Sequence, residues 1–353
     1  MHELNRKFDF NNELNNCTFI KTILMVLIVL YHSILFWSEN WFLVVGTPVF
    51  QCQLLKYLAV WLNSFHIYTF SLVSGYIFFY VKDEQKRYRD FLSFLKNKTK
   101  RLIIPYFFVS LIWVIPAKIF FRESFFIPAL LDVFLGIGCA QLWFLLMLFF
   151  VFIIAYALYP IIESNNKIIM FFLFLILLQC SLLGTVQKIP NYFQINNVLK
   201  HLPLFVLGMK LRQNKTCWLR NIPVWLYVLA DIFLCIVFIL LKNKTDNSII
   251  AVMLIVIGIL LNFVGALMFF FVTQKIIGSR NFYKNVFPFF FKRSMVVYLF
   301  HQQIVYFSLW IFNGKINPYF HATVNFFFAF LISILIGSFL MHFKYTRFLL
   351  GEK

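Results

Sequence analysis

The stretch TFIKTILMVLIVLYHSILFWS, residues 18–38, is mostly apolar and contains one cation, Lys21, and one imidazole, His32. A transmembrane helix needs roughly 20 mostly apolar residues, so this stretch is long enough to cross a bilayer. The first sixteen residues of the chain are polar, and they are not followed by a short apolar leader with a small-residue cleavage site, because the apolar stretch is long enough to span. We therefore interpret it as a retained first transmembrane helix and not as a removed secretory signal.

Nine further stretches of similar composition follow. Hydrophobic residues make up 62% of the chain and charged residues 13%, whereas a soluble domain has roughly 45–50% and about 25%. This composition excludes an ordinary soluble domain and indicates an all-α polytopic membrane protein of about ten transmembrane helices. Segment 123–140 is apolar but contains Pro128, Gly136 and Gly138, which favour a re-entrant or interfacial piece. The nine further predicted spans are residues 60–81, 102–121, 142–162, 167–186, 197–211, 222–241, 248–273, 294–312 and 322–342.

Lysine and arginine residues set the predicted orientation. If both termini lie in the cytoplasm, 23 of the 32 basic residues fall on the inner side and 8 on the outer side, with Lys21 inside the membrane. This bias follows the positive-inside rule, so the net charge of +19 reflects membrane topology and not nucleic-acid binding. We expect a cytoplasmic segment at residues 1–17, one transmembrane domain at 18–342 and a cytoplasmic tail at 343–353.

Ionisable side chains inside apolar spans are costly, which makes each of them a candidate functional residue. Lys21 and His32 are eleven residues apart, so they share one face of a helix and lie about 16 Å apart along its axis. His66, in the second span, is as far from the outer end of its helix as His32 is, so we expect the two imidazoles at similar depth. The alternative interpretations are neutral histidines bonded to a neighbouring helix and a lysine that snorkels to the headgroups. Asp231, in the seventh span, has no cation near it in its own helix.

The segment that leads into the third span is strongly basic, with Lys98, Lys100 and Arg101 within four residues. Such a segment is typical of contact with anionic lipid headgroups, and it would equally hold the phosphates of a substrate. Glu39 lies seven residues after His32, hence on a similar face, and is a candidate orienting carboxylate. The sequence has no zinc-binding spacing, glycine-rich phosphate loop or G-x-S-x-G motif, and we predict no metal.

Six short motifs lie in or at the predicted spans. They are Lys21 followed after ten residues by His32, Phe65-His66 through Ser74-Gly75-Tyr76-Ile77-Phe78, Arg101 through Pro105-Tyr106, Leu142-Trp143-Phe144-Leu145, Leu202-Pro203-Leu204-Phe205 through Gly208, and Tyr298-Leu299-Phe300-His301. In this order the motifs resemble the acyltransferase-3 family of bacterial inner-membrane acyltransferases, in the branch similar to fucose O-acetylases. The family commonly has arginine at the first position, where Lys21 keeps the charge but not the bidentate geometry.

The resemblance implies a membrane-bound O-acetyltransferase of the plasma (inner) membrane. It implies acetyl-coenzyme A, or another acyl-coenzyme A, as acyl donor, and a hydroxyl of a cell-surface polysaccharide sugar or of its lipid-linked precursor as acceptor. The essential histidine of the family's first helix corresponds to His32. We expect the anionic head of the donor to bind Lys21, Arg101, Lys98 and Lys100 at the inner surface, with its thin arm reaching up to His32.

In this scheme His32 is the general base that removes the proton of the sugar hydroxyl. An acyl-histidine intermediate is the alternative chemistry. His66 is expected to orient the acceptor or the oxyanion. We assign Glu39, Trp143 and His301 to acceptor binding.

A second class of protein also has many apolar helices with scattered histidines, namely a transporter or flippase for a lipid-linked sugar or another polar solute. Such a protein is expected to show paired repeats or interrupted helices in matching halves. We find no such repeats in the sequence. A purely structural subunit of a glycan-assembly complex is a third alternative, and it would bind no acyl donor.

Overall fold

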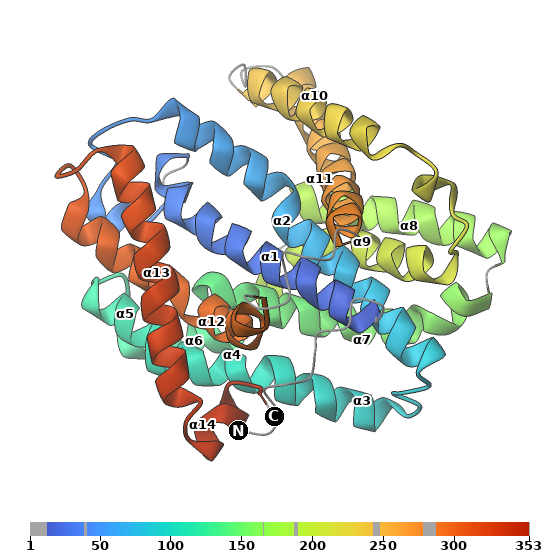
Figure 1. Ribbon diagram of the computed structural model, residues 1–353, viewed down its shortest axis with the longest axis horizontal. Helices are drawn as coiled ribbons and strands as arrows, with labels where there is room; N and C mark the ends of the chain where they lie inside the picture. Colours follow the sequence, from blue (N-terminus) through green and yellow to red (C-terminus); the bar gives the residue numbers. More distant parts are fainter. Residues whose placement is uncertain are drawn as a thin grey trace.

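The computed structural model describes residues 13–38, 41–164, 166–186, 190–242, 248–277 and 287–352, and this part of the chain is helical, without β-strands (Figure 1). The helices are α1 (Glu13–Ile34), α2 (Gln53–Phe79), α3 (Phe91–Lys98), α4 (Ile104–Val109), α5 (Ile115–Phe120), α6 (Phe126–Leu135), α7 (Trp143–Ser164), α8 (Lys167–Val186), α9 (Ile195–Gln213), α10 (Val224–Lys242), α11 (Ser248–Ile277), α12 (Phe287–Phe312), α13 (Pro318–Leu340) and α14 (Lys344–Leu349).

The all-α polytopic architecture is confirmed. Within the described residues, nine helices are long and apolar enough to cross a membrane. The predicted sixth span, residues 197–211, is the helix α9 but is not one of the nine. It packs against α2, α7 and α8, and Asn196, His201 and Arg212 on it are buried. Because α9 faces other helices rather than lipid, it can carry more polar side chains than a lipid-facing span.

The helices divide into central and peripheral ones. In the most apolar 18-residue stretch of α1, α2 and α12, the buried share is 67%, 72% and 67%. In α8, α10, α11 and α13, the corresponding share is only 17% to 28%. Figure 1 shows α1 running through the middle of the bundle, with α10 and α11 at one edge. The exposed phenylalanines and leucines of the peripheral helices therefore form the surface that faces lipid.

The crossing of α2 and α9 brings two backbones into direct contact. A Cβ atom added to Gly75 would lie 1.9 Å from the carbonyl oxygen of Phe205, and one added to Gly208 would lie 1.9 Å from that of Leu72. Both glycines belong to the motifs of the second and sixth predicted spans. Only glycine allows this approach, so these motifs encode a helix contact.

An ion pair joins the C-terminal ends of the same two helices. Arg212 of α9 donates from Nε and Nη2 to the two carboxylate oxygens of Glu84, each at 2.6 Å. Its Nη1 donates to the hydroxyl of Tyr76 at 3.1 Å. Glu84 ends a π-turn that follows α2, so this turn aims the carboxylate at α9.

The third span runs from Phe91 to Phe120 and contains two π-turns, at residues 99–103 and 110–114. Each π-turn comes just before a proline, Pro105 or Pro116, that cannot donate a backbone hydrogen bond to the preceding turn. The wider turns absorb this defect without breaking the helix. The first of them carries Lys100 and Arg101, so it sets the direction of the basic side chains.

The apolar segment 123–140 forms a ten-residue helix, α6, and not a span of its own. It ends at Gly136, whose φ is +72°, a conformation that glycine adopts without strain. The hydroxyl of Tyr106 donates to the carbonyl oxygen of Val133 at 2.6 Å. This bond ties the short helix to the third span.

Asp231 of α10 accepts a hydrogen bond from the indole nitrogen of Trp61 at 2.8 Å. The carboxylate is buried, and Trp61 lies on α2. Asp231 therefore fastens a peripheral helix to the central helix α2, an interaction that the sequence did not reveal.

Candidate functional site

Two histidines from central helices meet near the C-terminal end of α1. His32 lies near the end of α1 and is 8% exposed, and His301 lies within α12 and is fully buried. The Nε2 atom of His301 lies 3.1 Å from the Nδ1 atom of His32. His301 was predicted to bind the acceptor, and its contact with His32 was not predicted.

The backbone around the two rings defines which nitrogen atoms carry hydrogen. The Nδ1 atom of His301 lies 3.0 Å from the carbonyl oxygen of Val297 and 2.8 Å from that of Tyr298. Carbonyl oxygens only accept, so this Nδ1 carries a hydrogen, and the Nε2 of a neutral His301 holds a lone pair. The Nδ1 of His32 lies 2.9 Å from the carbonyl oxygen of Ile28, so it also carries a hydrogen, which it can share with His301. The lone pair of His32 is then on Nε2, the form that a general base requires.

Side chains from other elements hold the backbone of α12 beside His301. The indole nitrogen of Trp113 donates to the carbonyl oxygen of Phe300 at 3.1 Å. The amide nitrogen of Gln141 donates to the carbonyl oxygen of Leu299 at 2.6 Å. These bonds attach the third span and the start of α7 to the turn that carries His301.

A pair of glutamines strengthens this attachment. Gln141 and Gln303 donate to each other's amide oxygens, both at 3.0 Å. Both side chains are buried. Trp113, Gln141 and Gln303 were not among the predicted site residues. The run His301-Gln302-Gln303, three polar residues inside an apolar span, is the sequence signal that indicates such a network.

His66 lies next to the histidine pair without bonding to it. Its ring centroid is 4.7 Å from that of Tyr31, the residue before His32. Its Nδ1 atom donates to the carbonyl oxygen of Leu62. Its Nε2 atom is buried and has no hydrogen-bond partner among the described residues. A buried polar atom without a partner is costly, so this lone pair is available to a ligand hydroxyl.

Three of the four predicted basic residues lie together, between α1 and the start of the third span. Lys21, Lys98 and Arg101 are close enough to interact electrostatically. The Nζ atom of Lys21 lies 4.9 Å from the ring centroid of Phe70. In contrast, the Nζ of Lys100 lies over the ring of Phe348 in α14, at 4.8 Å.

A series of aromatic contacts links the basic residues to the histidine pair. Phe70, which contacts Lys21, lies 5.1 Å from Phe144, measured between ring centroids. Phe144 lies 6.3 Å from Tyr298, and Tyr298 lies 6.1 Å from His301.

Trp143, which was also predicted to bind the acceptor, contacts another histidine, His201. The ring of Trp143 lies 6.0 Å from that of His201, whose Nδ1 is 2.9 Å from the hydroxyl of Ser71. Glu39 lies outside the described residues. Among the described residues there is no group of three His, Cys, Asp or Glu side chains that could hold a metal ion.

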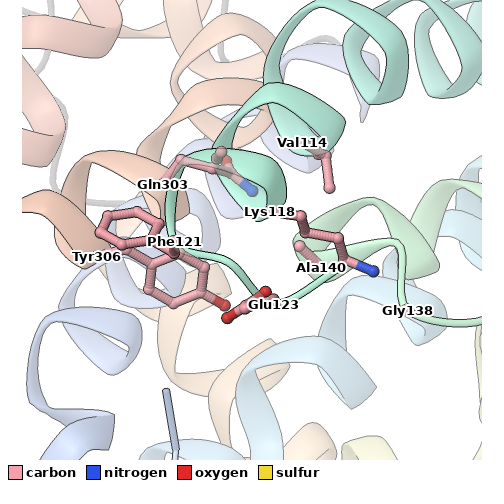
Figure 2. Close-up of a pocket in the computed structure, with 9 residues that line it drawn as sticks. Val114, Lys118, Phe121, Glu123, Gly138, Ala140, Gln303 and Tyr306 are labelled. Carbon is pink, nitrogen blue, oxygen red and sulfur yellow. The ribbon is translucent and has the colours of Figure 1, made fainter. Parts of the chain in front are cut away.

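The ring of Trp41 also contacts the histidine pair, at 5.8 Å from that of His32. Trp41 in turn lies 5.1 Å from Tyr306, which lines a cavity of about 290 Å³ (Figure 2). A second cavity, of about 590 Å³, lies between residues 50–54 and 315–319. Neither of these two cavities is lined by His32 or Lys21.

The comparisons with known proteins give one match. A family model described as an acyltransferase domain, of the acyltransferase-3 type, matches residues 15–343, which is nearly the whole chain. No curated protein and no solved structure matches the chain.

Proposed function

The chain belongs to this acyltransferase-3 family, and we propose that it is a membrane-bound O-acetyltransferase that uses a cytosolic acyl-coenzyme A. The acceptor is a hydroxyl of a cell-surface polysaccharide sugar, or of its lipid-linked precursor, at the plasma (inner) membrane. The observation that carries the proposal is the hydrogen-bonded pair of His32 and His301. This pair supports the role of His32 as a general base, whose free Nε2 atom would lie near the outer face of the membrane.

In the proposed reaction, the Nε2 atom of His32 takes the proton of the sugar hydroxyl while the sugar oxygen bonds to the carbonyl carbon of the thioester. The carbon–sulfur bond then breaks, and the coenzyme A thiolate leaves with the proton that His32 gives back. His301 accepts the Nδ1 hydrogen of His32 and so stabilises the imidazolium that forms in between. This arrangement follows the logic of a base that is oriented by a third group.

His66 orients the acceptor in this scheme. Its Nδ1 hydrogen is bonded to the carbonyl of Leu62, so its unpartnered Nε2 can only accept a hydrogen bond. A second hydroxyl of the sugar can supply that hydrogen. His66 therefore suits the acceptor better than the oxyanion, which requires a hydrogen-bond donor.

The acyl donor binds at the other end of α1. Lys21, Lys98 and Arg101 form a basic cluster whose combined charge suits the phosphates of coenzyme A. The helix positions of Lys21 and His32 differ by about 16 Å along the axis, a span that the extended pantetheine arm covers. In this scheme the arm passes the rings of Phe70, Phe144 and Tyr298.

An acyl-histidine intermediate uses the same Nε2 atom, which would attack the thioester itself. The two routes differ in one observable. The test is to incubate the protein with labelled acetyl-coenzyme A and no acceptor. Label bound to His32 would indicate the covalent route, and an unlabelled His32 would indicate direct transfer.

Mass spectrometry of the surface polysaccharide, from cells with and without the protein, tests the proposal. We expect sugars that are heavier by one acetyl group only when the protein is present. Identical polysaccharides together with transport of a polar solute in proteoliposomes, without consumption of acetyl-coenzyme A, would instead support a transporter or flippase.

A further inference from the structure

The cavity of about 290 Å³ lies at the opposite end of the third span from the basic cluster. Lys98 and Arg101 are near the start of this 30-residue span, whereas Lys118 is near its end. Phe121 and Glu123, which directly follow the span, also line the cavity, and Gln303 and Tyr306 of α12 complete its wall. By the predicted orientation, this is the outer side of the membrane.

The cavity offers both donors and acceptors of hydrogen bonds. Lys118 lines the cavity, and its ammonium lies 3.6 Å from a carboxylate oxygen of Asp132, which is not a lining residue. Figure 2 shows the carboxylate of Glu123 beside the ring of Tyr306, and the two groups interact electrostatically. The amide of Gln303 is held in place by its pairing with Gln141.

Two aromatic rings form the apolar part of the wall. The rings of Phe121 and Tyr306 are perpendicular, with centroids 6.4 Å apart. Tyr306 is further fixed by stacking on Phe42 at 3.8 Å. Rigid aromatic faces beside a few placed polar groups are typical of small-molecule sites, and they suit a ring that has C–H groups on its faces and hydroxyls at its edges.

Charge and size narrow the class of ligand. The ammonium of Lys118 interacts with two carboxylates, those of Glu123 and Asp132. The net charge of these three groups is negative, which disfavours the phosphates of coenzyme A and is compatible with a neutral ligand. The volume of about 290 Å³ is close to the lower limit of small-molecule pockets, roughly 300 Å³. The cavity is thus sized for one small ring.

We propose that this cavity is a subsite for a neutral pyranose residue of the acceptor glycan, adjacent to the residue that receives the acyl group. This inference rests on the proposed function for its placement beside the reacting sugar. The ring of Trp41 lies 5.1 Å from that of Tyr306, in the cavity wall, and 5.8 Å from that of His32. The cavity is therefore near enough to the histidine pair for the next residue of a bound glycan to lie at His32.

Saturation-transfer NMR on the full-length protein in lipid nanodiscs tests the subsite without any acyl transfer. The probes are methyl pyranosides, offered singly in the absence of an acyl donor. Wild type should transfer saturation to at least one of them, and Glu123→Gln should reduce the effect at least five-fold. Arg122→Gln, an exchange at the neighbouring exposed position, serves as the matched control and should leave it unchanged.

A second variant and a kinetic readout separate the possible failures. Ala117→Leu fills part of the cavity from a lining position and should raise the KM for the glycan at least five-fold without changing the KM for acetyl-coenzyme A. The subsite is refuted if no pyranoside binds, or if both variants bind it like wild type. If pyranosides bind as expected but no acyl group is ever transferred, the proposed function fails and the subsite stands.

Discussion

The Nε2 atom of His301 lies 3.1 Å from the Nδ1 atom of His32, although 269 positions separate the two residues in the chain. The carbonyl oxygens of Val297 and Tyr298 fix the hydrogen of His301, and that of Ile28 fixes the hydrogen of His32. The pair leaves one lone pair free, on the Nε2 atom of His32. The predictions on catalysis depend on this assignment.

Replacing His301 with leucine should lower kcat for acyl transfer and leave the KM for the acyl donor unchanged. Leucine has no atom that can accept a hydrogen bond from the imidazolium of His32. A hydrogen bond to an ionised group contributes about 1.5–3 kcal/mol, so we expect a loss of roughly 10- to 100-fold. His342→Leu, at an exposed histidine outside the site, is the matched control. Normal kcat in the His301 variant would show that His32 works without its partner.

Replacing Lys21 with alanine should raise the KM for acetyl-coenzyme A. The variant loses one cation of the cluster with Lys98 and Arg101, and a charge-assisted bond to phosphate is worth about 1.5–3 kcal/mol, or roughly 10- to 100-fold. Lys100→Ala is the control, because Lys100 points to Phe348. Equal effects of the two substitutions on the KM would contradict the assignment of the cluster.

The helices could be predicted from the sequence because lipid imposes a length and an apolar composition on every span. Residues 167–186 are predicted as a span and form α8 with the same bounds. The helix α9 could be predicted only from its pattern, because its surface contacts other helices and its composition is correspondingly more polar. The glycines of the α2–α9 contact were visible as motif residues, but their backbone contact was not.

The site could be predicted only where two residues share a helix. The spacing of Lys21 and His32 relates them along one axis, and the basic residues at 98–101 are adjacent in the chain. The contact between His32 and His301 depends on how α1 packs against α12, which no local pattern encodes. The same applies to the bonds of Trp113 and Gln141 to the backbone of α12, and to Trp61 and Asp231.

Replacing Gly208 with alanine should destabilise the protein. The new Cβ would lie 1.9 Å from the carbonyl oxygen of Leu72, so the helices must separate, which typically costs about 1–3 kcal/mol or more. Thermal unfolding in detergent should give a lower Tm. Gly258→Ala is the control, since its nearest neighbour would be a ring carbon of Phe238 at 3.4 Å, an ordinary contact. A Tm that is equal in both variants would argue against the close crossing.

Acceptor binding should weaken as the pH falls from neutral to mildly acidic. Partial burial raises the pKa of Glu123, while the ammonium of Lys118 lowers it to a smaller extent. A raised pKa means that the carboxylate is lost at a higher pH than for an ordinary glutamate. Other charged or titratable groups in this region are Tyr306, which interacts electrostatically with Glu123, Asp132, which pairs with Lys118, and Arg122, which precedes Glu123 in the chain.

The measurement for this prediction is the KM for the glycan as a function of pH, in wild type and in Glu123→Gln. The wild-type KM should rise at low pH towards the value of the variant, whose KM should stay constant. Protonation of His32 changes the rate in both proteins, so only the difference between the two profiles reports on Glu123. If the KM for the glycan changed with pH in the same way in wild type and in Glu123→Gln, Glu123 would have no role in acceptor binding.

The most direct test of the account is the transfer of labelled acetyl groups from acetyl-coenzyme A to glycan in membranes that contain equal amounts of wild type, His32→Ala or His342→Ala. General base catalysis contributes typically 10²–10⁴-fold. We therefore predict that His32→Ala loses at least about 100-fold in rate, while His342→Ala transfers label like wild type. Near-normal transfer by His32→Ala would contradict the central role of this histidine.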